Sequence, residues 1–145
     1  MSEQTDVQVN SSNEDQKSYV VAGAVLMCNC GTQYSRLKMP LSHGVYIKGK
    51  AQMNVEDYIP NINIMPFGNC VNPSNPDVQN GRVDIEGVKK APCIPKVTLP
   101  WRNGKVNKVI EGSAALLNDC TNKCTFNGDI IIVDNGQNLG GTIVG

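Results

Sequence analysis

Six cysteines and a single histidine, His43, are the residues whose chemistry could define a site in this sequence. The cysteines lie near expected strand ends or in loops: Cys28, Cys30, Cys70, Cys93, Cys120 and Cys124. They form no Cys-x-x-Cys knuckle, so their spacing alone is a poor zinc signature. Thiolates gathered from distant loops could nevertheless hold a metal ion and tie the chain together without a large core.

Three fates remain open for these thiols: metal ligation, disulfide formation, or burial as small apolar side chains. The compartment decides between the first two, because disulfides need an oxidising setting. Residues 1–18 are polar and lack the basic start and apolar stretch of a signal peptide. We therefore expect synthesis in the cytosol without Sec-type export.

His43 could act as the base for a cysteine nucleophile. Such chemistry also needs an orienting acid and an oxyanion site, and no protease signature surrounds any cysteine. The carboxylates of Glu56, Asp57 and Asp84 show no spacing typical of a catalytic pair. We therefore interpret His43 as a turn or strand-entry residue hydrogen-bonded to backbone, and we predict no catalytic residue and no enzymatic activity.

Short strands joined by turns must position these side chains. The sequence predicts a strand over residues 19–27 with a break at Gly23, a hairpin over 44–55 that turns at Lys48-Gly49, and a last strand over 129–133. Asn-Gly, the strongest two-residue hairpin signal, occurs at 80–81, 103–104, 127–128 and 135–136. These pairs predict type I′ turns and favour hairpins over helices.

Seven of the eight prolines fall between Pro60 and Pro100. Proline cannot donate to a sheet, so this region is predicted to be irregular surface loop. One helical turn is predicted to start at Asn75-Pro76, with Asn75 as the cap and proline in the first helical position.

Two segments echo each other, YIKGKAQM at residues 46–53 and VIEGSAAL at 109–116. Each has a β-branched residue, a charged residue, glycine, alanine and then a large apolar residue. The echo predicts one hairpin unit used twice about a pseudo-symmetric axis, and chance similarity of short hairpins is the alternative.

The amino-acid composition limits the classes of partner that can be expected and the stability that a buried core can supply. The 145 residues fit one domain, and the 13 basic and 13 acidic residues cancel, so nothing favours a nucleic-acid partner. Aromatic residues make up only 5% of the chain, which limits what burial can contribute to stability. A domain of this kind would benefit from cross-links.

Several motifs, taken in order, resemble those of PAAR-like proteins, the spike tips of type VI secretion and related contractile injection systems. The resemblance covers about residues 19–137 and is carried by YVVAGA at 19–24, CNCGT at 28–32, LSHGV at 41–45, NINIMPFGNC at 61–70, APCIP at 91–95, Trp101 after a proline, and CTFNGDI at 124–130. Two features depart from the family pattern. Residues 77–87 are polar where relatives are often Ala-rich, and Cys120-x-x-x-Cys124 is spaced more widely than is usual.

The resemblance implies an all-β, small conical PAAR-like fold of short β-hairpins with long Pro-rich loops over residues 19–137. Residues 1–18 are then expected to form a disordered arm and residues 138–145 a flexible Gly-rich end. The implied function is a structural tip that caps a VgrG-like trimeric spike, one tip chain per trimer, and sharpens the needle for membrane puncture. Effectors carried by the tip would be separate proteins.

On this hypothesis the protein is in the bacterial cytoplasm when assembled on the spike. On firing it is delivered outside the cell or into a target cell, and it contacts the target membrane only during puncture. The alternative is a stand-alone zinc-binding or redox thiol module. A secreted disulfide scaffold is disfavoured by the absence of a signal peptide.

The family pattern also selects candidate site residues. A structural zinc ion is expected on Cys28, Cys70, Cys93 and Cys124, with Cys30, Cys120 and His43 as alternates. The two echoing hairpins are expected to pair with the spike by β-augmentation through their apolar positions, which are Val45, Ile47, Met53, Val109, Ile110 and Leu116.

Overall fold

The computed structural model describes residues 17–138, whose regular structure is short strands and one helical turn. The predicted all-β class is confirmed. Most of the predicted arm at 1–18 and of the predicted Gly-rich end at 138–145 lies outside the described residues. The elements are β1 Val25–Cys28, β2 Ser35–Arg36, β3 Tyr46–Ile47, β4 Lys50–Ala51, β5 Asn69–Cys70, α1 Pro76–Gln79, β6 Arg82–Val83, β7 Lys89–Pro92, β8 Lys105–Ile110, β9 Ser113–Ala115, β10 Thr121–Lys123 and β11 Asp129–Asp134.

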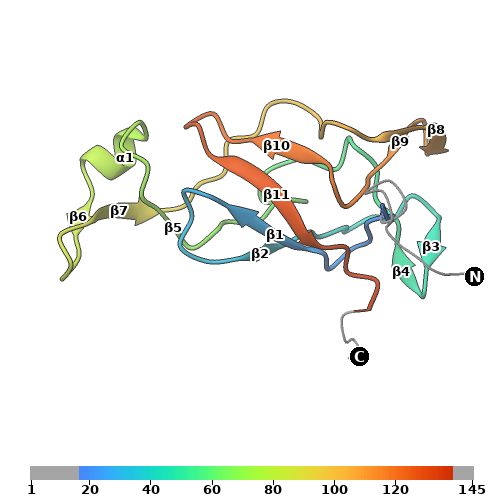
Figure 1. Ribbon diagram of the computed structural model, residues 1–145, viewed down its shortest axis with the longest axis horizontal. Coiled ribbons are helices and arrows are strands. Elements are labelled where there is room, and N and C mark those ends of the chain that lie inside the picture. Colours follow the sequence, from blue (N-terminus) through green and yellow to red (C-terminus); the bar gives the residue numbers. More distant parts are fainter. Residues whose placement is uncertain (1–16, 139–145) are drawn as a thin grey trace, which may run out of the picture.

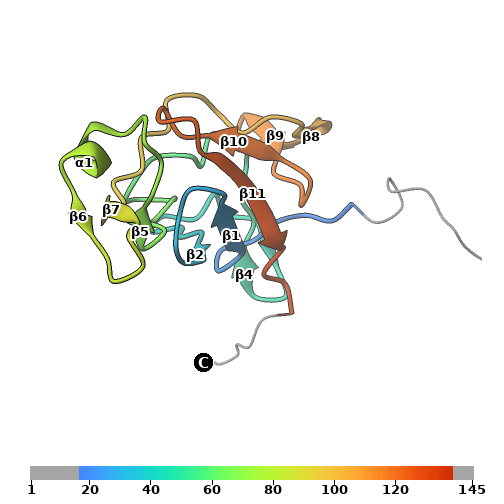
Figure 2. The same cartoon turned by 60° about the vertical axis from the view of Figure 1, so that its left-hand side comes forward.

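The strands form four small sheets in an elongated molecule (Figure 1). A four-stranded antiparallel sheet, ordered β10-β11-β1-β2, occupies the middle. The hairpins β3–β4 and β8–β9 lie together at one end, which we call the hairpin end. At the opposite end β5, β7, β6 and α1, residues 69–92, form the distal lobe, which the turned view in Figure 2 separates from the central sheet.

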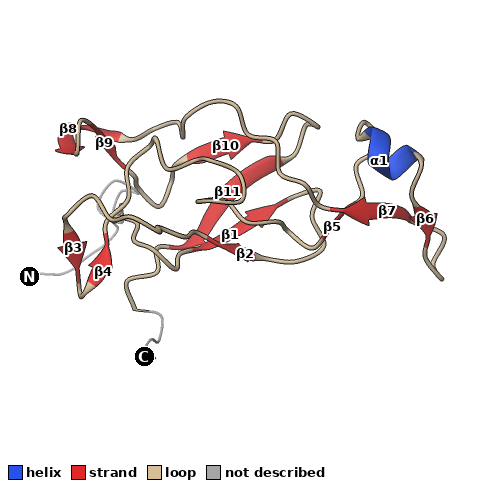
Figure 3. Cartoon of the chain, turned by 180° about the vertical axis from the view of Figure 1, so that it is seen from behind, coloured by secondary structure: helices blue, strands red, loops and turns tan. Residues whose placement is uncertain are grey.

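The core lies against the central sheet, and the two-residue period of a strand selects its side chains. Along β11, Ile130 and Ile132 are buried while Ile131 and Val133 face outward. Phe67 and Trp101 complete the core, and the Trp101 indole Nε1 donates to the carbonyl of Asp57 at 3.1 Å. Among the described residues only these two aromatic side chains are buried, and Tyr34 and Tyr46 are more than half exposed. Long loops cover much of the rest of the molecule (Figure 3).

Three extended segments meet at the hairpin end, and we call residues 19–21, 52–54 and 115–117 the inner segments. Each pairs with the next in a closed cycle through isolated antiparallel bridges: Val21 with Gln52, Asn54 with Ala115, and Leu117 with Tyr19. The cycle gives the chain an internal pseudo-three-fold axis.

Backbone hydrogen bonds close this cycle. Val20 N–H donates to Leu116 C=O, Leu116 N–H to Met53 C=O, and Met53 N–H to Val20 C=O, each at 3.0 Å. The side chains of these three residues are fully buried at the centre of the cycle. Each inner segment therefore finds backbone partners on two sides, which leaves few unsatisfied polar groups in the interior.

The sequence echo at 46–53 and 109–116 corresponds to two hairpins of the same register. Tyr46 pairs with Ala51 as Val109 pairs with Ala114. Both turns are type I′, with φ of 53° and 78° at Lys48 and Gly49, and 49° and 87° at Glu111 and Gly112. Each hairpin leads directly into an inner segment. The predicted repeat about a pseudo-symmetric axis is confirmed by this geometry.

The prediction of type I′ turns at the four Asn-Gly pairs is wrong, because none has positive φ at both residues. Asn103 and Asn127 alone are left-handed in their pairs, with φ of 73° and 67°. Asn80 has φ of −97° and caps α1, so its pair belongs to a helix end and not to a hairpin turn. The true type I′ turns use a charged residue before glycine.

The Pro-rich region holds more regular structure than predicted. The helical turn at Asn75-Pro76 is confirmed, with the Asn75 side chain accepting from the Asp77 N–H at 2.9 Å. Residues 69–92, however, form a three-stranded sheet and not only loop. Proline is tolerated there because Pro92 is the last residue of β7 and does not interrupt the strand.

The two equivalent turns predict equal costs for equivalent substitutions. A Cβ at Gly49 or Gly112 would meet no atom within 4 Å, so the penalty comes only from the left-handed backbone. We expect Gly49→Ala and Gly112→Ala each to lower the free energy of unfolding by about 1–2 kcal/mol in urea titrations. As a control, Lys48→Gly relieves a left-handed position but also removes the exposed hydrogen bond from the Lys48 Nζ to the Asn138 Oδ1, at 2.8 Å, so its net effect should be smaller than that of either glycine substitution. A large loss at only one glycine would contradict the equivalence of the hairpins.

Candidate functional site

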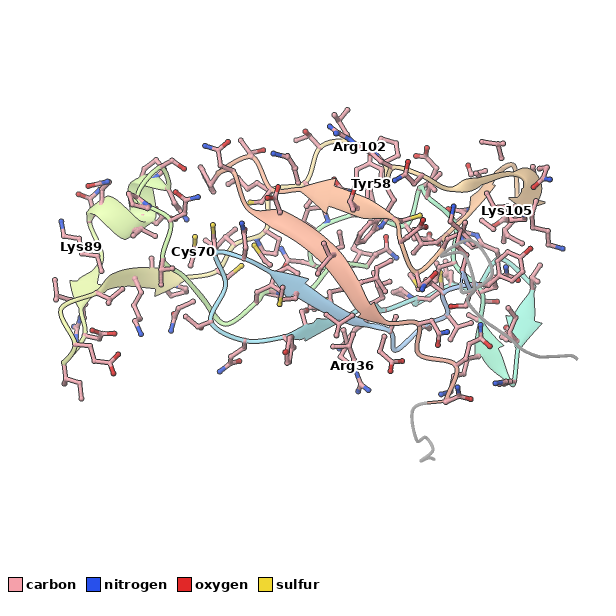
Figure 4. All side chains as sticks on the ribbon, viewed as in Figure 1. Arg36, Tyr58, Cys70, Lys89, Arg102 and Lys105 are labelled. Atoms are coloured by element: carbon pink, nitrogen blue, oxygen red, sulfur yellow. The ribbon has the colours of Figure 1, made fainter. Side chains whose placement is uncertain are left out.

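Five of the six cysteines line one pocket where the distal lobe joins the body. Figure 4 shows sulfur atoms gathered beside Cys70 at this junction. The lobe supplies Cys70, at the end of β5, and Cys93 lies directly after the last lobe strand, β7. The body supplies Cys28 at the end of β1, Cys30 just beyond it, and Cys124 in the β10–β11 connection. The structure therefore brings together all four predicted ligands and one alternate.

Two glycines make room for this pocket. A Cβ on Gly128 would lie 2.7 Å from the Cys28 Sγ, and a Cβ on Gly31 would lie 2.5 Å from the Phe67 Cβ. Both approaches are too short for any other residue. Other pocket walls are apolar and include Phe126 and Ile130. The backbone at Gly128 thus approaches the Cys28 sulfur closely; Cys28 and Cys70 are buried, whereas Cys30, Cys93 and Cys124 are partly exposed.

This environment raises the pKa of two of the thiols, Cys28 and Cys93. Burial is the main cause that raises the pKa of Cys28 to about 11, and the neighbouring thiols Cys30, Cys124 and Cys93 raise it further. Burial likewise raises the pKa of Cys93, which also faces Cys70 and Cys124. A cation would reverse this tendency, because a bound metal stabilises the thiolate.

The donors suit a thiophilic ion, but residues 17–138 contain no group of three or more Cys, His, Asp or Glu side chains placed to coordinate one as they stand. All six cysteines in this part of the chain are free thiols. Zinc ligation by Cys28, Cys70, Cys93 and Cys124 therefore stays a prediction that fits the chemistry and location of the thiols.

Cys120, an alternate ligand in the sequence prediction, lies outside this pocket. Its Sγ accepts the Leu117 N–H at 3.2 Å within a turn closed by Cys120 N–H and Leu117 C=O. Asp57 occupies the equivalent place after another inner segment, where its carboxylate accepts the Asn54 N–H at 2.8 Å. Cys120 is therefore a turn-forming residue of the pseudo-three-fold unit.

The distal lobe meets the body at this pocket and through backbone pairing beside it, such as the hydrogen bond from the Val71 N–H to the Cys30 carbonyl at 3.0 Å. The lobe's own core contains only Cys70, Val78 and Ala91, with Cys30 of the body packed against them. Such a small cluster contributes little hydrophobic stabilisation. The thiols at the junction therefore occupy the position where a cross-link would most restrain the lobe.

His43 lies at the hairpin end between two carboxylates. It is not among the residues that line the thiol pocket. Its Nε2 is 2.8 Å from the Asp57 Oδ2, and its Nδ1 contacts the Glu111 Oε1. The expectation of a backbone-bonded turn histidine is corrected here, since both ring nitrogens bind side chains. The prediction missed these partners because Glu111 is 68 residues away and no local pattern marks the pairing.

The pKa of His43 reflects a balance. Partial burial lowers it, but the hydrogen bonds to Glu111 and Asp57 together with their negative charges outweigh burial and raise the pKa above its usual value. The protonated imidazole donates to both carboxylates and thereby links the turn of β8–β9 to the loop before β3. Engaged on both sides, the ring is not arranged as a base toward a thiol.

The six predicted spike-binding residues divide by exposure. Met53, Ile110 and Leu116 are buried and can affect docking only through the hairpins that they hold in place. Val45 and Ile47 are half-buried, and Val109 is 58% exposed. Exposed apolar side chains that the prediction omitted are Tyr46 and Val106, on the same two hairpins.

Comparison with known proteins identifies one family. The family model described as "Domain of unknown function (DUF4280)" matches residues 20–137, which is more than half of the chain. No curated protein and no solved structure matches significantly. Among the described residues, no helix has the length and hydrophobicity to cross a membrane.

The histidine contact predicts a pH-dependent stability. Because the folded-state pKa of His43 is raised, its contribution is full below the unfolded value of about 6.5 and is lost as the pH rises through the folded value. We expect the free energy of unfolding in urea to fall between pH 6 and pH 8.5 for the wild type. His43→Gln should remove most of this fall, and Glu111→Gln should remove part of it. An unchanged slope in His43→Gln would show that another group titrates.

Proposed function

Because the chain belongs to the DUF4280 family, whose function its description leaves open, we propose a function from the geometry: a PAAR-like structural tip that caps a trimeric spike. The spike would be VgrG-like, part of a type VI secretion system or a related contractile injection system. The tip would sharpen the needle for membrane puncture and carry separate effector proteins. The sequence motifs at 61–70 and 124–130 support this assignment through their resemblance to the family of spike tips.

The observation that carries the proposal is the pseudo-three-fold cycle at the hairpin end. A single chain on top of three identical chains faces a symmetry mismatch. Three inner segments that pair cyclically give one chain near-equivalent backbone directions around an axis. Such an end can be matched to a three-fold partner, whereas the distal lobe has no comparable repeat.

The exposed residues of the hairpins support the same docking end. Tyr46, Val106 and Val109 present apolar surface there, and the short strands β3 and β8 have free edges among the described residues. Free strand edges accept further strands. In this proposal the spike covers these edges, and the distal lobe points toward the target membrane.

We further propose that the thiol pocket binds one structural zinc ion through Cys28, Cys70, Cys93 and Cys124. Cys30, which lines the same pocket, would replace one of them or remain a free thiol. The ion would supply tetrahedral thiolate ligation and fix the distal lobe to the body. The same pocket favours the second candidate function, a stand-alone zinc-binding or redox thiol module, which would need no spike partner.

Localisation follows from the proposal. The tip would be assembled on the spike in the bacterial cytoplasm and would leave the cell, or enter a target cell, on firing. Contact with a membrane would be limited to puncture, and no nucleic acid is involved.

A pull-down against the trimeric spike protein tests the proposed function. We expect the full-length chain to co-purify as one copy per trimer, and Val109→Asp to reduce binding at least tenfold by placing an unpaired charge in the interface. Val83→Asp is the matched control, since Val83 is equally exposed, at 56%, but lies in the distal lobe. Failure of the wild type to bind would exclude the spike-tip role, and equal loss in both variants would place docking elsewhere.

Elemental analysis with thiol titration tests the zinc site. We expect about one zinc per chain in the wild type and in Cys120→Ser, and loss of zinc in Cys70→Ser and Cys93→Ser. Removal of zinc by a chelator should speed hydrogen exchange over residues 69–92 more than over β11, because the lobe loses its cross-link. Protein without zinc and without free thiols would indicate disulfides, and protein without zinc but with free thiols would indicate inert cysteines.

A further inference from the structure

The hairpin formed by β6 and β7 carries exposed aliphatic side chains at its turn, and we call residues 82–90 the lobe hairpin. Ile85 is 103% exposed, Val83 56% and Val88 42%. Figures 1 and 3 place β6, and the turn that follows it, at the extremity of the molecule opposite the hairpin end. Single exposed aliphatic residues are ordinary on protein surfaces. Three of them on one protruding turn point to a contact with an apolar medium.

Hydrogen bonds hold this turn in one conformation. The Asp84 N–H donates to the Val88 carbonyl at 2.9 Å, and the Asp84 Oδ1 accepts the N–H groups of Glu86 and Val88 at 2.8 and 2.9 Å. Gly87 is left-handed, with φ of 85°, and its N–H donates to the Asp84 carbonyl at 3.0 Å. Lys90 adds an ion pair to the Asp84 carboxylate at 2.9 Å. The aliphatic side chains are therefore displayed on a preformed scaffold.

Aliphatic side chains lie on both faces of the lobe hairpin. Val83 pairs with Lys89, so the side chains of these two residues share one face. Val88 directly precedes Lys89 and pairs with Asp84 across the turn, which places its side chain on the other face. Ile85 projects from the turn beyond both. A protein partner would cover one face of such a ribbon, whereas a fluid medium can surround both faces.

Basic side chains lie just behind the aliphatic turn, at Arg82, Lys89 and Lys90. Because Lys90 is paired with Asp84, Glu86 is the exposed acidic residue that remains at the turn. With three basic and two acidic residues, the lobe hairpin has a small net positive charge. An apolar tip backed by basic residues is typical of elements that bind a lipid–water interface, where long basic side chains reach the headgroups.

We propose that the turn of the lobe hairpin inserts into the surface of a lipid bilayer that contains anionic lipid, with Ile85 deepest and Val83 and Val88 beside the headgroups. This inference deepens the spike-tip function and rests on it for the orientation of the distal lobe, because the turn then enters the target membrane first. Only three aliphatic side chains are inserted, so binding of the free chain is weak and reversible. Weak binding is consistent with membrane contact that is limited to puncture.

Titration of the full-length chain with lipid vesicles tests the proposal, using phosphatidylcholine alone and phosphatidylcholine mixed with phosphatidylglycerol. We expect binding to both, stronger on the mixed vesicles, and Ile85→Ser should lower the partition coefficient about tenfold because it removes the deepest aliphatic side chain. Val106→Ser is the matched control, since Val106 is 85% exposed but lies at the hairpin end. Glu86→Gln should raise binding to the mixed vesicles about fivefold and leave binding to phosphatidylcholine nearly unchanged, because it removes an acidic charge near anionic headgroups.

The outcomes separate this inference from the proposed function. Equal binding by the wild type and Ile85→Ser, no binding by either, or an equal loss in Val106→Ser would overturn the inference. A benzophenone amino acid at Ile85 should label lipid in the mixed vesicles, and capture of a second copy of the chain in place of lipid would give the turn another occupant. The vesicle assay contains no spike. Failure there with an intact spike pull-down removes only this inference, and a failed pull-down with intact vesicle binding removes only the spike-tip function.

Discussion

Three backbone amides, those of Val20, Met53 and Leu116, each donate to the carbonyl of another residue of the same trio. This closed cycle joins parts of the chain that lie far apart in sequence, so it can form only after long loops have closed. Once formed, it satisfies buried polar groups without a large sheet and leaves three apolar side chains packed at its centre. The hairpins and the central sheet are arranged around it, since each inner segment either follows a hairpin or leads into a strand.

The three inner segments have the same backbone pairing, but the side chains at their equivalent positions differ. After two of the inner segments, a side chain accepts the amide three residues earlier: a carboxylate at Asp57 and a thiol at Cys120. Desolvation raises the pKa of Cys120 to about 11, so the thiol remains neutral, whereas Asp57 is drawn into the contact with His43. Equivalent positions therefore have different roles. Cys120 closes a turn with an uncharged side chain, whereas Asp57 closes the equivalent turn and also contacts His43, which links two hairpins.

Short-range patterns could be predicted from the sequence, and long-range ones largely could not. The cap at Asn75, the turn at Lys48-Gly49 and the last strand at 129–133 depend on neighbouring residues, and the structure has all three. The third copy of the repeat, around Val20, was missed because no hairpin precedes it in the described chain. The His43 contacts were missed because their partners come from distant turns. The grouping of Cys28, Cys70, Cys93 and Cys124 was predicted from the family resemblance. Only the structure shows that Cys120 lies outside their pocket.

With only 5% aromatic residues, the chain can bury little aromatic surface, and its two ends are stabilised in different ways. At the hairpin end, cohesion comes from paired backbone around a fully buried apolar trio. In the distal lobe, three small buried side chains give too little buried area to hold residues 69–92 against a load. Sulfur from both sides of the junction lies where a single bound ion would join them. In the proposed tip, force would enter through the base and meet resistance at the point, so the junction would transmit the load. A metal–thiolate cross-link there would stiffen the part of the molecule that apolar packing stabilises least.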